Sequence, residues 1–231
     1  MLIIISISSC NYLDVDKWFD DTMKYDTIFS RKEYLERYMW NIAAQFPAED
    51  ALLASPYTPG PLATDEAFAP FASGTYLGTA MVIGEINEEN ISSISIYSWN
   101  SMYKIIRKTN VILSRMDEVK DLTNLDKSDI WAYTYFMRAY AYYHLIMDFG
   151  PVILVGEVYP SNEQPEAYAN IRSTYDECID YACEQFETAA SYLPETQPTS
   201  SFGRPTKGAA YGLIARLRLI QASPLFNGKG Q

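Results

Sequence analysis

Few residues in this 231-residue chain could carry out chemistry. The one histidine, His144, falls within the most apolar stretch of the sequence. Without a second histidine it has no partner for a shared metal site or a Ser-His-Asp relay, so a hydrogen-bonded structural role is the interpretation we favour. The phosphate-binding patterns GxxxxGK[ST] and GxGxxG are both missing from the sequence. The sequence therefore predicts no metal and no cofactor.

Carboxylates are plentiful, with 29 acidic residues against 18 basic ones and a net charge of −11. Such a charge repels phosphate backbones, so we expect no nucleic-acid partner. A glycosidase would need two carboxyl groups held about 5–9 Å apart across a sugar. Asp65 and Glu66 are adjacent in a loop, where neighbouring side chains usually point in different directions. We therefore predict no catalytic residue.

Two of the three cysteines, Cys178 and Cys183, fall in a segment with helical character. A separation of five residues places them about 140° apart around a helix axis, so they cannot easily pair or share a metal. We expect both to be ordinary half-buried helix residues, because a free cysteine behaves as a small hydrophobe.

Cys10 closes the apolar, serine-rich run ISISSC and is followed by the polar residues NYLD. A disulfide is disfavoured because the other cysteines lie far along the chain in a helix, whereas a buried thiol stays possible. Lipidation fits better, since small residues before the cysteine resemble a lipoprotein cleavage site. We interpret residues 1–9 as the remnant of a signal peptide, with a short first strand as the alternative, and Cys10 as the lipidated residue.

Apolar residues recur at helical spacing over most of the chain. Within residues 25–46 we expect a helix with Ser30 as its N-cap and Glu33 completing a capping box. Further helices are expected within residues 97–119, 129–150, 165–192 and 207–222, with an extended connection over 151–160. Helix pairs joined by turns, with small residues at the contacts, indicate an all-α tetratricopeptide-like array.

Residues 47–95 are rich in proline, glycine, serine and threonine and form a long irregular loop region in this interpretation. Loops of that length usually carry function. The aromatic residues Phe68, Phe71 and Tyr76 lie near Asp65 and Glu66, and aromatic faces stack on sugar rings while carboxylates accept hydroxyl hydrogen bonds. The alternative is that these aromatics anchor the loop to the core.

Three segments in order resemble the SusD/RagB family. The stretch IWAYTYFMRAYAYYHLIMDFGPVIL is similar to a central helix with F-x-RAY-x-Y and an aromatic-glycine-proline turn, and FGRPTKGAAYGLIARLRLIQASPLFNGKG is similar to the segment that follows it. Before them, LATDE and then W-N-x-x-Y-x-x-I-x-x-x-N, from Trp99 to Asn110, match the order of features. Family members are considerably longer, so we expect residues 10–231 to be the N-terminal portion of a longer protein.

The resemblance implies a binding protein and not an enzyme. It implies a lipid-anchored protein on the outer-membrane surface of a Bacteroidetes-type bacterium, which captures a glycan, or sometimes a peptide, for a SusC-like TonB-dependent transporter. The fold implied is all-α, and the ligand site implied includes Asp65, Glu66, Phe68, Phe71 and Tyr76. Two alternatives stay open: a helical scaffold that binds only a protein partner, and a glycan-processing enzyme that uses Asp65 or Glu66.

Overall fold

The structure is a computed structural model, and it describes residues 25–46, 63–65, 77–85, 99–158 and 171–227. Within these ranges the regular elements are helices and no strand occurs. The elements are α1 (Tyr25–Ile28), α2 (Lys32–Ala43), α4 (Leu77–Val82), α6 (Trp99–Arg115), η3 (Met116–Glu118), α7 (Asn124–Phe149), α8 (Tyr175–Tyr192), η5 (Thr199–Ser201), α9 (Lys207–Gln221) and α10 (Pro224–Asn227).

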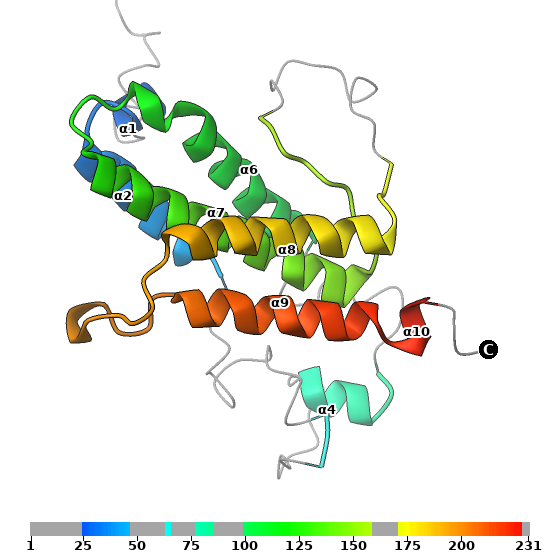
Figure 1. Cartoon of the computed structure of the whole chain (residues 1–231). Helices are drawn as coiled ribbons and strands as arrows, with labels where there is room; N and C mark the ends of the chain where they lie inside the picture. Colours follow the sequence, from blue (N-terminus) through cyan, green and yellow to red (C-terminus); the bar gives the residue numbers. More distant parts are fainter. Residues whose placement is uncertain (1–24, 47–62, 66–76, 86–98, 159–170, 228–231) are drawn as a thin grey trace, which may run out of the picture.

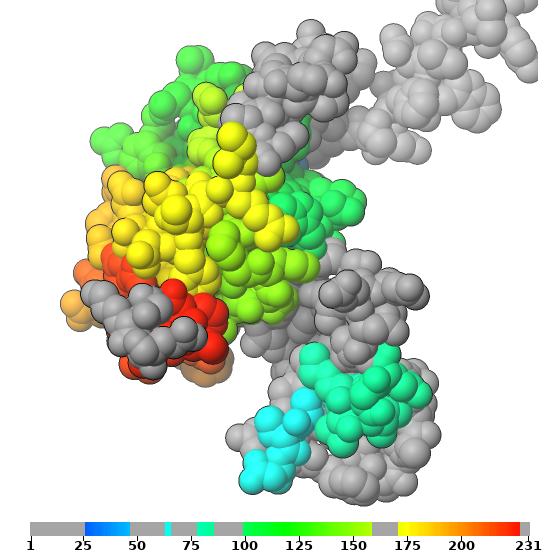
Figure 2. All heavy atoms as spheres, turned by 90° about the vertical axis from the view of Figure 1, so that its right-hand side faces the viewer, coloured from blue at the N-terminus to red at the C-terminus, as the bar shows by residue number. Residues whose placement is uncertain are grey.

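The long helices form a series in which each packs against the next one along the chain (Figure 1). Helix α6 packs against α7, α7 against α8, and α8 against α9, while α2 covers one side of α6 and α7. The predicted all-α tetratricopeptide-like array is confirmed by this arrangement. Helix α4 lies apart from the series in both views (Figures 1 and 2). None of the described helices is both long enough and apolar enough to cross a membrane.

Helix α7 is the centre of the fold, because neighbours bury it on several sides along its 26 residues. It begins five residues before the predicted start at Asp129, at a capping box in which Thr123 and Asp126 each bind the other's backbone N–H. Apolar periodicity does not reveal this first turn because Leu125 is exposed to solvent. The helix ends at Phe149, and its C-cap Gly150 has a φ of 72°, which suits glycine.

Two further helix starts were also predicted wrongly. Ser30 does not cap α2: its hydroxyl donates to the carbonyl of Thr27 at 2.7 Å, and the N-cap is Arg31. Helix α8 begins at Tyr175, where Thr174 and Glu177 form a capping box, and residues 171–174 before it are not helical. The earlier part of the predicted helix, residues 165–170, lies outside the described residues. The six-residue helix α4 falls inside the predicted loop region, where proline and glycine obscure its short helical pattern.

Cys178 and Cys183 are fully buried in α8, rather than half-buried as predicted, and both are free thiols. Burial raises the pKa of both thiols, so they stay protonated and behave as small apolar side chains. Cys178 also contacts the backbone of Val152, with its sulfur 3.3 Å from the amide nitrogen. This contact ties the start of the extended connection to α8.

Candidate functional site

Two of the sequence motifs meet at the extended segment 152–158. The Tyr103 hydroxyl accepts a hydrogen bond from the backbone N–H of Ile153 at 2.9 Å and donates to the carbonyl of the same residue at 2.7 Å. The Tyr142 hydroxyl does the same at Val155, accepting at 2.7 Å and donating at 3.2 Å. Alternate residues of an extended chain point their backbone groups to the same side. The two tyrosines therefore form hydrogen bonds with the backbone N–H and C=O groups along one edge of this segment, as a neighbouring strand would.

A polar cluster under the same segment completes its attachment. The side-chain amide of Asn110 donates to the carbonyls of Val155 at 3.0 Å and Glu157 at 3.1 Å. The Asn110 carbonyl oxygen in turn accepts from the guanidinium of Arg138 at 2.9 Å, and that guanidinium also donates to the Gln185 side chain. Side chains from α6, α7 and α8 thus share one hydrogen-bond network.

The protonation of these tyrosines suits their role. Burial raises the pKa of Tyr103 to about 12, and it raises the pKa of Tyr142 further still. Both hydroxyls keep their protons at neutral pH, so each can donate and accept at the same time. These groups hold backbone in place, and nothing in their geometry activates a nucleophile.

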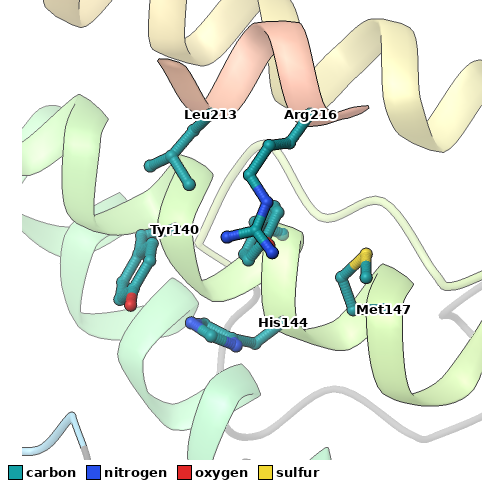
Figure 3. A pocket seen from close by; sticks show the side chains of 6 residues that line it. Tyr140, His144, Met147, Leu213 and Arg216 are labelled. Atoms are coloured by element: carbon teal, nitrogen blue, oxygen red, sulfur yellow. The ribbon is translucent and has the colours of Figure 1, made fainter. Parts of the chain in front are cut away.

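A pocket of about 290 Å³ lies between α7 and α9 (Figure 3). The side chains that line it are Tyr140, Tyr143, His144, Met147, Leu213 and Arg216. The four residues from α7 are spaced by three, one and three, which places them on one face of that helix. Figure 3 shows Leu213 and Arg216 reaching towards them from α9. This pocket was not predicted from the sequence, because the spacing on α7 gives one wall of it and not the position of α9 opposite that wall.

The pocket walls are mostly ring faces and edges that already contact one another. Tyr140 and Tyr143 lie nearly parallel with ring centroids 6.0 Å apart, and His144 stands edge-on to Tyr140 at 4.4 Å. The guanidinium of Arg216 lies 5.9 Å from the centre of the Tyr143 ring. Tyr143 is only 5% exposed, so little of its face is left for a sugar ring.

The chemistry of this pocket is that of a receptor for an apolar group beside a negative charge. Its volume of about 290 Å³ lies below the range of about 300–1,000 Å³ that is usual for small-molecule sites. Its walls hold a thioether, an aliphatic side chain and aromatic rings, with one guanidinium at the rim. Among the described residues, no cluster of three or more potential metal ligands occurs.

The structure places only part of the predicted site. Asp65 is described and exposed to solvent. Glu66, Phe68, Phe71 and Tyr76 lie outside the described residues, as does Cys10. Their predicted roles stay predictions. His144 lies buried in α7, where it contacts two tyrosine rings.

Comparison with known proteins decides the family. A SusD-like family model, described as starch-binding and associating with the outer membrane, matches residues 11–219. The chain belongs to this SusD-like family. No curated protein is detectably similar to it in sequence.

Solved structures share the SusD-like fold. A SusD-like protein from Bacteroides fragilis is similar with a TM-score of 0.58 and 22% identity, over 89% of this chain and 37% of its own. A laminarin-binding SusD-like protein has a TM-score of 0.58 and 19% identity, over 80% of this chain and 38% of its own. Surface glycan-binding protein A from Bacteroides uniformis has a TM-score of 0.65 and 20% identity, over 82% of this chain and 42% of its own. The SusD-like chain described here therefore spans less than half the length of these relatives.

Proposed function

We propose that this SusD-like protein binds an oligosaccharide at the cell surface and delivers it to a SusC-type TonB-dependent transporter in the outer membrane. The family match over residues 11–219 is the observation that carries the proposal. The laminarin-binding and surface glycan-binding names of two structural relatives favour a glycan over a peptide.

The ligand site proposed is the loop that contains Asp65, Glu66, Phe68, Phe71 and Tyr76. Aromatic rings there would stack on sugar faces, and the two carboxylates would accept hydroxyl hydrogen bonds. The exposure of Asp65 to solvent agrees with such a role. Stacking of this kind needs an open ring face, which Tyr143 in the α7–α9 pocket does not offer.

Isothermal titration of the purified protein against a panel of oligosaccharides tests the binding role. Phe71→Ala and Tyr76→Ala should each weaken binding of the best ligand about fivefold, because each removes one stacking face worth about 1 kcal/mol. Phe202→Ala is the matched control, since Phe202 is an exposed aromatic in a different loop. Tight binding that survives both loop substitutions would remove this loop from the site.

Delivery to a transporter calls for its own measurement. Affinity purification of the protein from its native membrane should recover a TonB-dependent transporter. Recovery of the transporter by a protein with no affinity for any glycan would favour the scaffold alternative instead.

Lipidation is proposed at Cys10, where several acyl chains at about 0.8 kcal/mol per buried CH₂ would give stable anchoring. Mass spectrometry of the native N-terminal peptide tests this, and an unmodified Met1 would contradict it.

A further inference from the structure

Two buried polar groups beside segment 152–158 have no hydrogen-bond partner among the described residues. They are the Nε–H of Arg138 in α7 and the hydroxyl of Tyr181 in α8, two helices that pack side by side (Figure 1). The Arg138 side chain is 6% exposed, so bulk water does not reach it freely. Buried polar groups in folded proteins nearly always have a partner. Two such groups in neighbouring helices therefore point to a ligand that binds between them.

A closed ring of four side chains brings the two groups into one neighbourhood. Gln185 accepts a hydrogen bond from the Arg138 guanidinium, which joins α8 to α7. Tyr181 precedes Gln185 by four residues, so their side chains are neighbours on α8. Tyr142 likewise follows Arg138 by four residues on α7. The rings of Tyr142 and Tyr181 meet edge to face with their centroids 5.2 Å apart, and this contact closes the ring.

The backbone of residues 155–157 covers this ring of side chains. A Cβ added at Gly156 would lie 3.8 Å from the Tyr181 hydroxyl oxygen, so that hydroxyl lies close to the Gly156 backbone. The carbonyls on either side of Gly156 accept hydrogen bonds from the side-chain amide of Asn110. Because both amide hydrogens of Asn110 point to this backbone, its oxygen faces Arg138. The Arg138 Nε–H and the Tyr181 hydroxyl therefore lie between the extended segment and the helices beneath it.

The positive charge in this neighbourhood has no paired carboxylate. The Arg138 guanidinium donates to the neutral side-chain oxygens of Asn110 and Gln185. None of the ion pairs formed by the described residues includes Arg138. A buried charge is normally compensated by an opposite charge, because its removal from water is costly. The unpaired charge therefore favours a ligand that carries a negative charge.

The two groups are both hydrogen-bond donors at neutral pH. Burial raises the pKa of the Tyr181 hydroxyl; the charge of Arg138 lowers this pKa, and the exposed carboxylate of Glu184 raises it. The hydroxyl keeps its proton, and the arginine Nε–H can only donate. A water molecule can accept from both donors, but it brings two hydrogens that need acceptors of their own. An anion accepts from both donors and needs none.

We propose that Arg138 and Tyr181 bind a small monovalent anion, chloride in the simplest case, between α7 and α8 beneath residues 155–157. The anion accepts hydrogen bonds from the Arg138 Nε–H and the Tyr181 hydroxyl, and it neutralises the buried guanidinium. It thereby strengthens the attachment of the extended segment to the two helices. This site is separate from the loop proposed to bind a glycan, so either proposal can fail without the other.

Thermal melting at constant ionic strength tests the proposal. Replacing sodium gluconate by sodium chloride at about 200 mM should raise the melting temperature by about 3 °C or more, because a ligand that binds the folded state stabilises it. Tyr181→Phe removes the hydroxyl but keeps the ring against Tyr142, and it should reduce this rise at least about twofold. Glu184→Gln removes a nearby negative charge and should increase the rise. Tyr192→Phe, at a 40% exposed tyrosine of the same helix, is the matched control and should leave the rise unchanged.

Bromide, which replaces chloride in such sites, locates the anion directly. Crystals of the protein grown in sodium bromide should show an anomalous diffraction peak in contact with the Arg138 Nε and the Tyr181 hydroxyl. Equal melting temperatures in gluconate and chloride would overturn the proposal, and so would a chloride-dependent rise that Tyr181→Phe leaves unchanged. A water molecule or a carboxylate of the protein bound to the Arg138 Nε in these crystals would overturn it as well.

Discussion

Arg138 is a buried cation held by neutral acceptors. Its side chain is 6% exposed, and its polar partners are the side-chain amides of Asn110 and Gln185, with the ring of Tyr135 at 5.0 Å. No carboxylate of the described residues pairs with it. A planar fork with several donors can serve two amides at once, which a lysine cannot do. The residue therefore sets the geometry between three helices.

Replacing Arg138 with methionine should lower the free energy of unfolding by about 2–4 kcal/mol, because two buried amide oxygens lose their donor. Arg138→Lys should cost nearly as much, since one ammonium cannot reproduce both contacts. Urea-induced unfolding measures both variants. Lys104→Met, on the exposed side of α6, is the control and should stay within about 0.5 kcal/mol. A neutral result for Arg138→Met would show that the network does not hold the helices together.

Asp126 gives the chain a pH-dependent contribution to stability. Its carboxylate accepts from the Lys32 ammonium at 2.5 Å and from the Thr123 backbone N–H at 2.9 Å. The hydrogen bond from Lys32, followed by those from Thr123, lowers the pKa of Asp126 from 3.8 to about 2. Because the folded pKa lies below the unfolded one, this contribution is complete above about pH 4 and is lost as the pH falls towards 2.

Asp126→Asn should therefore lower the free energy of unfolding by about 1 kcal/mol at pH 6, as expected for a helix cap with an exposed ion pair. The difference from the unsubstituted chain should shrink as the pH falls from 4 to 2, when the wild-type carboxylate becomes protonated. Denaturant unfolding at several pH values measures this. A difference that stays constant down to pH 2 would contradict the assignment.

At the scale of elements, the turn between α8 and α9 is held by a stack of side chains. The guanidinium of Arg204 lies 4.2 Å from the centre of the Trp40 ring, and Trp40 in turn contacts Tyr133 at 5.1 Å. Gln197 donates to the carbonyl of Pro205 at 2.7 Å and closes the turn. Gly203 precedes the stacked arginine with a φ of 92°. The glycine-arginine pair of the sequence motif thus joins the α8–α9 turn to α2.

Arg204→Ala should lower the free energy of unfolding by about 1 kcal/mol, because it removes a cation–π contact at a partly exposed site. Gly203→Ala should cost about 1–2 kcal/mol, because alanine resists a positive φ. Chemical denaturation checks both. Arg204→Lys keeps the positive charge but not the planar guanidinium. It should recover only part of the stability lost in Arg204→Ala, since lysine stacks less well on the indole ring.

Sequence patterns predicted the elements better than their ends. The four long helices from Trp99 onwards, α6 to α9, carry long apolar periods and were predicted with the correct type and order, whereas the four-residue α10 was not predicted. Starts were missed where a polar side chain decides them, as at Thr123 and Thr174, whose capping boxes leave no apolar period. The family motifs identified Tyr103, Asn110, Arg138 and Tyr142, but only their meeting at segment 152–158 shows why those residue types are needed.

The candidate site was less predictable than the fold. A pocket between α7 and α9 depends on how two helices far apart in sequence are placed, and single-helix periodicity does not contain that information. His144 was correctly expected to lie in the most apolar helix, and it is buried there. The predicted ligand loop stays a prediction, since Asp65 is the one of its five residues that the structure describes.

At the scale of the whole molecule, the exposed apolar surface of α9 and α10 should govern the behaviour of the 231-residue chain. Leu219 and Leu225 are 75% and 81% exposed. Large exposed apolar side chains of this kind promote association between protein molecules. The net charge of −11 opposes association, but the exposed charges on α9 itself are the two basic residues Arg216 and Arg218.

The chain expressed alone should therefore associate as its concentration rises, and light scattering after size-exclusion chromatography should report a growing mass. The double variant Leu219→Lys with Leu225→Lys should stay monomeric, because two ammonium groups interrupt the apolar surface. Leu125→Lys adds the same kind of charge at an equally exposed leucine on α7 and should leave association unchanged. A soluble, cooperatively melting monomer of the unsubstituted chain would contradict this prediction. Equal rescue by Leu125→Lys would assign the effect to net charge and not to the exposed apolar surface of α9 and α10.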